Sequence, residues 1–191
     1  NLLKRIVVLG SEEPALRVLL SDEARGPATA RSFERLLEEV EQSAGESLAI
    51  VGIHRRGAPL AGRLQRLVSD LPETEVPLGP IDIAFYRDDV ATRVDQPVVH
   101  ASQLDFPIDG RTVVTVDDEL YTGRTVRAAI EALFDYGRPG KVRLAVLADR
   151  GHRELPIRPD YVGKNLPTSR AERISVHLAE VDGRDEVVLD P

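Results

Sequence analysis

The constraint that most limits the fold is a series of short apolar runs separated by helix-like segments. Leu48–Ile53 reads LAIVGI, without a polar side chain, as expected of a strand that is buried on both faces. Thr112–Val116 and Lys141–Ala148 are two more such strands. Between the strands, Ala58–Val68 and Arg124–Phe134 carry apolar residues at helical spacing. This alternation predicts an α/β fold with a central, mostly parallel, twisted sheet and helices on both of its faces.

Two further patterns extend the predicted sheet structure. Ile81–Tyr86 is apolar and aromatic, and it predicts another strand. Near the end of the chain, Ile174–Val181 and Glu186–Leu189 are expected to form a β-hairpin, with Asp182-Gly183 as its turn.

The domain organisation follows from the remaining segments. Thr29–Ser43 has apolar residues at helical spacing, and Thr29 can cap that helix. We expect residues 29–191 to form one domain, preceded by an N-terminal extension, residues 1–28, to which no structure is assigned. Arg87–Pro107 is polar and lacks periodicity, so we interpret it as a flexible active-site flap or as a plain mobile hairpin.

Composition narrows the class of protein. The chain has 191 residues, of which 42% are hydrophobic, enough for one core, and no apolar run approaches the roughly 18 residues of a membrane span. Its net charge of −7 disfavours a general nucleic-acid binder. The absence of cysteine excludes thiolate metal sites and is compatible with the cytoplasm, and the four histidines are scattered, which disfavours a histidine metal site. Arg138–Arg173 is locally basic, which indicates a solvated face or a site for an anion.

The stretch Val113–Thr125, VVTVDDELYTGRT, carries the clearest functional pattern. Asp117 and Asp118 follow an apolar strand, and a small, hydroxyl-rich loop then leads into a helix. The free N–H groups of a helix N-terminus favour an anion, and Gly123 leaves the backbone open to it. Two adjacent carboxylates accept hydrogen bonds from vicinal hydroxyls. A phosphate joined to a diol is a ribose 5-phosphate, so we expect a site for that group.

The string VDDELYTGRT closely resembles the phosphoribosyl-pyrophosphate (PRPP) signature of type I phosphoribosyltransferases. Together with VGIHRRGAPLA, DIAFYRDD and LADRGHRELPIRPDYVGKNLPTSR, it makes the chain similar to the PyrR family over roughly Leu48 to Leu189. The resemblance implies a type I phosphoribosyltransferase fold and the conversion of uracil and PRPP to UMP and pyrophosphate. It also implies UMP-responsive binding to pyrimidine-operon mRNA. The alternative is an RNA-binding regulator that uses the pocket as a nucleotide sensor, with catalysis weak or lost.

The resemblance also assigns residues to the ligand. The PRPP-binding residues would be Val116, Asp117, Asp118, Glu119, Leu120, Tyr121, Thr122, Gly123, Arg124 and Thr125. The pyrophosphate loop would be Arg55, Arg56 and Gly57, and the catalytic residues Asp117, Asp118 and Arg56. Mg²⁺ would arrive with PRPP, so no metal is bound by the protein alone. Glu119 stands where the family has an apolar residue. It would either raise the pKa of a neighbouring carboxyl or weaken binding of the polyanionic substrate, or it would point into solvent.

The base and the flap are assigned less directly. The base-binding candidates are Tyr161 and Val162, in the stretch Asp160–Gly163 that resembles the family's base-recognising loop, and Arg138, which lies apart from it in YGRPGK. Tyr161 could instead be a core residue, and Arg138 could neutralise a helix end. The flap would include Arg87, Asp88 and Asp89.

The RNA-binding candidates form a basic set in which one member, Arg35, lies apart from the others. They are Arg35, Arg150, His152, Arg153, Arg158 and Lys164. Glu34 and Glu38 replace polar or basic residues of the family and would oppose RNA phosphates. The expected partners are uracil, PRPP, UMP and the leader mRNA, in a cytoplasmic homo-oligomer (a dimer or larger) without contact to a membrane.

Overall fold

The structure, a computed structural model, describes residues 48–69, 75–88 and 102–190. The predicted helix Thr29–Ser43, the predicted domain boundary before Thr29, and the site candidates Arg35 and Asp89 lie outside these residues. None of the described helices is long and apolar enough to span a membrane.

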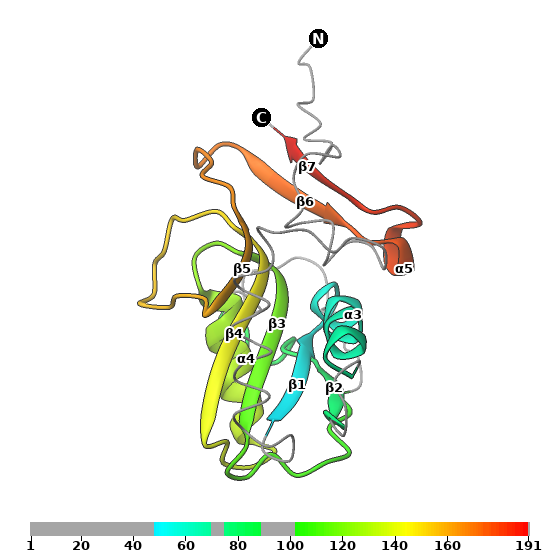
Figure 1. Cartoon of the computed structure of the whole chain (residues 1–191). Coiled ribbons are helices and arrows are strands. Elements are labelled where there is room, and N and C mark those ends of the chain that lie inside the picture. The colour runs from blue at the N-terminus through cyan, green and yellow to red at the C-terminus, as the bar shows by residue number, and fades with distance from the viewer. Residues whose placement is uncertain (1–47, 70–74, 89–101, 191) are drawn as a thin grey trace.

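The core of the fold is a five-stranded sheet with the strand order β2-β1-β3-β4-β5, and every pair of neighbours is parallel (Figure 1). Its strands are β1 (Leu48–Ile53), β2 (Leu78–Ile81), β3 (Thr112–Leu120), β4 (Lys141–Asp149) and β5 (Tyr161–Asn165). The parallel sheet predicted from the alternating apolar runs is therefore confirmed. Because the strands are parallel, their carboxyl ends share one edge, where ligands bind in sheets of this kind.

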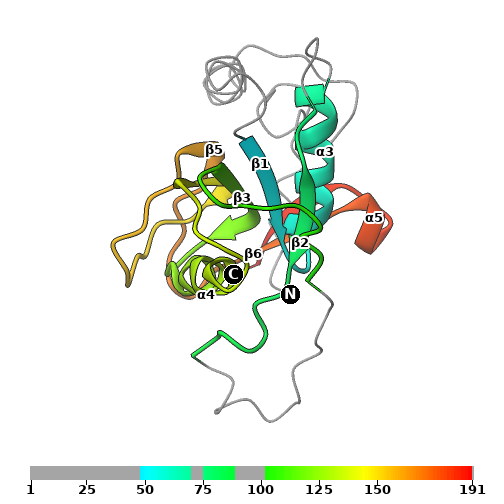
Figure 2. The ribbon, with the colours of Figure 1, turned by 90° about the horizontal axis from the view of Figure 1, so that it is seen from below.

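Two helices cover opposite faces of this sheet (Figure 2): α3 (Gly57–Ser69) and α4 (Arg124–Phe134). All of β1 is buried, and alternate residues serve the two layers. Ile50 packs in one cluster with Leu60 of α3, whereas Val51 packs in another with Ala129 of α4. This two-sided burial explains why the strand has no polar position.

A separate antiparallel pair, β6 (Arg173–His177) and β7 (Glu186–Asp190), lies beyond the carboxyl ends of β1 and β3 (Figure 1). The predicted hairpin is confirmed, but its predicted turn is wrong. The first strand ends at His177, and a single helical turn, α5 (Ala179–Asp182), makes the connection. The Asp182 carboxylate accepts a hydrogen bond from the Leu178 N–H at 2.9 Å, which closes this turn.

Three other strand predictions are corrected. The strand predicted at Ile81–Tyr86 ends at Ile81, because the Asp82 carboxylate accepts the Ala84 N–H at 2.7 Å and the chain turns there. The stretch Asp160–Gly163, predicted as a loop, contains the start of edge strand β5. Strand β3 runs on to Leu120, so both aspartates stand on the last part of a paired strand.

Candidate active site

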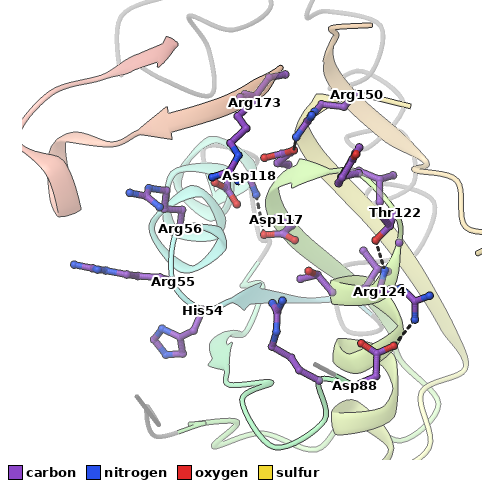
Figure 3. A pocket seen from close by; sticks show the side chains of 18 of the residues that line it. His54, Arg55, Arg56, Asp88, Asp117, Asp118, Thr122, Arg124, Arg150 and Arg173 are labelled. Carbon is purple, nitrogen blue, oxygen red and sulfur yellow. Dashed lines mark hydrogen bonds and ion pairs between the residues drawn. The ribbon is translucent and has the colours of Figure 1, made fainter. Parts of the chain in front are cut away.

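A pocket of about 770 Å³ lies at the carboxyl ends of β1 and β3. Its lining includes the three residues after β1, His54 to Arg56, and the continuous stretch from Asp117 to Val126. We call residues 117–125 the phosphoribose loop. Arg87 and Asp88 of the predicted flap also line it, as do Arg170 and Arg173 from the chain leading into β6. Figure 3 shows these side chains converging from separate elements.

The two aspartates differ in their surroundings. Asp117 is 5% exposed, whereas Asp118 is only half-buried. The Asp117 carboxylate accepts the Asp118 N–H at 3.0 Å. Burial raises the pKa of Asp117 well above its usual value, and the neighbouring charge of Asp118 raises it further. The pair therefore offers acceptor oxygens to a ligand and holds on to a proton at Asp117 more readily than ordinary carboxylates would.

The phosphate end of the loop is built by Gly123 and the start of α4. Gly123 is the N-cap of α4 with φ = 94°, a left-handed conformation that favours glycine. Helix α4 has no acidic residue in its first turn and no side-chain hydrogen bond at its cap. The first N–H groups of this helix lie at the pocket, where they can bind an anion. Thr122 and Thr125 line the same end of the pocket with hydroxyl groups.

The side chain of Arg124 points to the start of the predicted flap. It forms ion pairs with Asp88 and, at 2.8 Å, with Glu154 (Figure 3 draws the first). Asp88 therefore connects the segment after β2 to the phosphoribose loop. The two ion pairs are about half exposed, so we assign them an orienting effect rather than much stability.

The arginine-bearing loop after β1 packs directly against the aspartates. A Cβ placed on Gly57 would lie 2.2 Å from the Val116 carbonyl oxygen, so only glycine permits this contact. Arg55 is exposed, whereas Arg56 is half-buried and forms a two-bond ion pair with Asp182 of α5. The peptide bond between His54 and Arg55 is cis.

Glu119 is half-buried and paired within the fold, contrary to the interpretation that it points into solvent. Its carboxylate pairs at 2.8 Å with Arg150, whose residue is 6% exposed. Arg150 also lies over the Tyr121 ring, with 4.1 Å between guanidinium carbon and ring centroid. Burial raises the pKa of Glu119, and the hydrogen bond from Arg150 opposes that rise. As the other interpretation proposed, Glu119 adds to the raised pKa of Asp117, although it is the weakest of the contributions.

The base-binding candidates do not meet at this pocket. Tyr161 is 5% exposed and packs in the core cluster on the α3 side, as its alternative interpretation had it. Val162 lines a different, more open pocket beside Arg158. Arg138 precedes β4, and its N–H bonds the Asp109 carboxylate at 2.8 Å, so it lies at the amino ends of the strands, opposite the site. Because the pocket lies at the carboxyl ends of the strands, Arg138 cannot contact a ligand bound there.

The predicted RNA-binding face is also corrected in part. We call residues 150–164 the basic segment. Arg150 is buried, and His152 Nε2 is bonded to the Thr168 carbonyl at 2.5 Å. Arg153 pairs with Asp149 at 2.6 Å and donates to the Tyr121 carbonyl at 2.8 Å. These three side chains attach the segment to neighbouring parts of the fold, while Arg158 is exposed and Lys164 is half-buried.

Among the residues at the pocket that were missed from the sequence, three are charged groups that the function can use. Arg170 and Arg173 line the pocket from the β6 side, and Figure 3 shows Arg173 reaching in above Asp118. Both belong to the locally basic stretch Arg138–Arg173, which indicated a solvated face or an anion site. The sequence did not indicate which of its basic residues would reach the pocket. Asp182, the partner of Arg56, had no signal beyond its interpretation as a turn residue.

Known proteins share this architecture. The family model described as phosphoribosyl transferase domain matches residues 24–180. The hypoxanthine phosphoribosyltransferase of Trypanosoma cruzi, solved as a ternary substrates complex, has a TM-score of 0.65 at 18% identity, over 94% of this chain and 91% of that chain. A purine phosphoribosyltransferase from Pyrococcus horikoshii has a TM-score of 0.51 at 27% identity, over 71% of this chain and 80% of that chain. The fold and the matched domain define a type I phosphoribosyltransferase.

Two relatives narrow the class. The Bifunctional protein PyrR of Roseiflexus sp. is 57% identical over 155 residues, covering 80% of this chain and 85% of that protein. The Bifunctional protein PyrR of Deinococcus radiodurans is 52% identical over 181 residues, covering 93% and 96%. The chain belongs to the PyrR family.

Proposed function

We propose that the protein transfers the phosphoribosyl group of PRPP to uracil, giving UMP and pyrophosphate. One observation carries this proposal: a single pocket joins a pair of carboxylates, the N-terminus of helix α4 and an arginine-bearing loop. These three features suit the ribose hydroxyls, the 5-phosphate and the pyrophosphate of PRPP. The PyrR family of the chain supports uracil as the acceptor.

The phosphoribose loop would hold the sugar and its phosphate. Asp117 and Asp118 accept hydrogen bonds from the two ribose hydroxyls, and the half-buried Asp118 is the more accessible of the pair. The N–H groups that follow Gly123, with the hydroxyls of Thr122 and Thr125, donate to the 5-phosphate. Fixing both ends of the phosphoribose in this way places its C1 carbon between the base and the leaving group.

The reaction is a substitution at the ribose C1 carbon. The bond from C1 to a pyrophosphate oxygen breaks and its electron pair leaves with that oxygen. A bond from uracil N1 to C1 forms, and the N1 proton passes to water. Positive charge develops on the ribose ring and negative charge on the departing pyrophosphate. Arg56, beside the aspartates, would stabilise the second, and Asp117 and Asp118 lie where they can stabilise the first.

Mg²⁺ fits this site as a companion of the substrate. The described residues contain no group of three or more side chains able to hold a metal ion. Asp117 and Asp118 offer carboxylate oxygens, the donor type that Mg²⁺ accepts alongside phosphate oxygens and water. When bound, the ion would neutralise phosphate charge, and the protein residues would orient what it carries.

We also propose UMP-responsive binding to the leader of pyrimidine-operon mRNA. The relatives are named bifunctional, and two basic side chains are exposed: Arg170 lines the pocket, and Arg158 lies beside the second, more open pocket. Arg150 supplies a connection, since it bonds Glu119 on the pocket wall and, at 2.5 Å, the Glu172 carbonyl next to Arg173. A nucleotide in the pocket could therefore alter the basic segment. These substrates imply a cytoplasmic protein.

A homo-oligomer, a dimer or larger, completes the proposal. Phe85, Phe134 and Tyr136 are 75%, 55% and 41% exposed, and such aromatic side chains suit a contact between copies.

A steady-state assay tests the main proposal. The protein with Mg²⁺, PRPP and radiolabelled uracil should form UMP, and hypoxanthine in place of uracil should give no nucleotide. Binding of UMP and of a leader RNA without any turnover would favour the alternative, a regulator that has lost catalysis. Neither UMP formation nor UMP binding would overturn both.

A further inference from the structure

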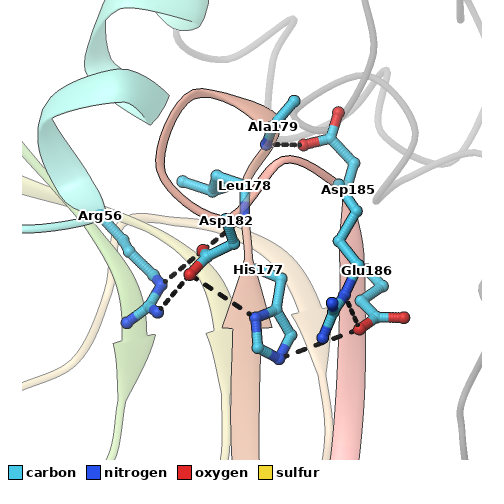
Figure 4. A network of polar contacts seen from close by, with 8 residues as sticks. Arg56, His177, Leu178, Ala179, Asp182, Asp185 and Glu186 are labelled. Atoms are coloured by element: carbon cyan, nitrogen blue, oxygen red, sulfur yellow. Dashed lines mark hydrogen bonds and ion pairs between the residues drawn. The ribbon is translucent and has the colours of Figure 1, made fainter.

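We propose that Asp182 of α5 is a positioning residue for the pyrophosphate loop, which holds the Arg56 guanidinium so that its free edge faces the departing pyrophosphate. The inference rests on the proposed transferase function and adds a residue from a distant part of the chain. Figure 4 shows the arrangement, in which Arg56 reaches out of the loop after β1 toward α5.

The geometry is a two-bond fork. Arg56 Nε donates to Asp182 Oδ2 at 3.2 Å, and Arg56 Nη2 donates to Asp182 Oδ1 at 3.0 Å. The planar guanidinium is thereby fixed in direction, because both bonds must be kept in one plane. The Nη1 hydrogens lie on the other edge of the group and take no part in the fork, and Arg56 is one of the residues that line the pocket. Asp182 itself is not one of the described residues that line the pocket.

Asp182 is in turn held by its own surroundings. Its Oδ2 accepts the Leu178 N–H at 2.9 Å, and its side chain is 17% exposed. His177 Nδ1 lies 3.7 Å from Asp182 Oδ1 on the side away from Arg56 (Figure 4). The carboxylate therefore cannot follow Arg56 freely, and it directs the arginine.

A second contact fixes α5 to α3 independently of Arg56. The buried Arg63 of α3 bonds Glu180 at 2.8 Å through Nε and Asp185 at 2.9 Å through Nη2. Asp185 also accepts the Ala179 N–H at 2.8 Å. The turn is thus attached to the helix that begins at the pyrophosphate loop, by contacts that do not involve Arg56.

The physical consequence is a pre-oriented cation. A free arginine loses side-chain freedom when it binds a phosphate, whereas one already held by a carboxylate loses less. The hydrogen bond to Asp182 raises the pKa of Arg56, and the charges of Asp182 and Asp118 raise it further. If Asp182 instead competed with pyrophosphate for Arg56, removing its charge would increase the affinity for pyrophosphate. The measured direction of the change therefore distinguishes a positioning role from a competing one.

The test compares Asp182→Asn with the matched control Asp185→Asn in the same turn. Asparagine at 182 can still accept the Leu178 N–H but loses the charge and the second acceptor of the fork. We expect its KM for PRPP and its dissociation constant for pyrophosphate to rise about ten-fold, or about 1.4 kcal/mol. The dissociation constant for UMP, which lacks pyrophosphate, should be unchanged, and kcat should fall less than KM rises. Asp185→Asn keeps the two bonds from Arg63 to Glu180 that attach α5 to α3, so it should lower the melting temperature while leaving all these constants as in the parent.

Each outcome decides the inference. Pyrophosphate binding as tight in Asp182→Asn as in the parent, or tighter, would overturn it, and a tighter value would identify a competing carboxylate. If Asp182→Asn fails to fold, Arg56→Lys replaces it: lysine keeps the charge but loses the fork, and parent-like pyrophosphate affinity there would also overturn the inference. A parent that binds pyrophosphate but forms no UMP would contradict the proposed function, and the pyrophosphate titrations would still decide the role of Asp182.

Discussion

The phosphoribose loop and the basic segment are both rich in charge, but a key side chain of each differs in how far it is paired within the fold. In the loop, Asp118 makes no ion pair with any described residue, and it is left facing the pocket. In the basic segment, Arg150 and Arg153 are each engaged by several partners within the fold. Because a saturated charge has little left for a ligand, the first region is suited to binding and the second to support.

The two regions meet at one contact. Arg150 pairs with Glu119 and lies over Tyr121, so the basic segment forms the wall behind the phosphoribose loop. A buried ion pair need not add net stability, but removing one partner leaves the other charge buried and unpaired. The comparison therefore predicts that substitutions in the loop remove function, whereas substitutions in the buried part of the segment remove stability.

The largest expected effect is on turnover. Asp118→Asn combined with Thr122→Ala should reduce UMP formation by about a thousand-fold, because acceptors for the ribose and a donor to the phosphate are lost together. The melting temperature should stay close to that of the parent, since neither side chain belongs to the core. Turnover at the rate of the parent would show that the loop is not the phosphoribose site.

The second effect is on stability. Arg150→Ala should lower the free energy of unfolding by about 2–3 kcal/mol, because the half-buried Glu119 loses its partner and the bonds of Arg150 to Thr168 and to the Glu172 carbonyl are lost as well. Denaturant titration measures this, with Arg158→Ala as the exposed control, for which a change within about 0.5 kcal/mol is expected. Equal losses in the two variants would remove the distinction between buried and exposed cations.

A third prediction concerns pH and Asp117. Its pKa is raised in the folded state, so its contribution to stability is fully present below the unfolded carboxyl pKa and is lost as pH rises through the folded pKa. Asp117→Asn avoids that loss and should be more stable than the parent by about 1–3 kcal/mol at pH 8, with the difference shrinking toward pH 4. Thermal melts at both pH values check it, and a difference independent of pH would contradict it.

The smallest expected effect is on RNA. Arg158→Ala should weaken binding of a pyrimidine-leader stem-loop by only a few-fold and reduce the slope of log affinity against log salt concentration by about one.

Conversely, replacing Glu34 with Thr and Glu38 with His should tighten RNA binding by about a few-fold, more at low salt than at high salt. A titration with each variant at two salt concentrations tests both. A change that ignores salt would argue against phosphate contacts.

Sequence patterns predicted the parts of the fold that depend on local order. The bounds of Leu48–Ile53 and Arg124–Phe134 are as predicted, because burial on both faces and helical spacing are properties of contiguous residues. The edge strand at Tyr161–Asn165 was missed, since YVGKN contains a glycine and a lysine and only its first residue is buried. Ile81–Tyr86 misled in the other direction: it has the composition of a strand, yet Phe85 is 75% exposed in a turn.

The same limit applies to the site. The phosphoribose loop is one continuous stretch, so its residues could be brought together from the sequence alone. Arg56 and Asp182 lie far apart in the chain, and only the position of β6 and α5 over the carboxyl ends of the strands brings them together. Arg150 likewise pairs with Glu119 and does not face solvent, and this depends on tertiary contacts that cannot be predicted from composition.

The central claim is that the ligand phosphate is held by the loop after β3 and not by the basic segment. Backbone amide NMR during a UMP titration tests it most directly, because amide shifts report which N–H groups approach the phosphate. We expect the largest changes at Gly123, Arg124 and Thr125, with smaller ones at Gly151 and Arg158. The largest changes at Gly151 and Arg158, with the amides of α4 unmoved, would contradict the account.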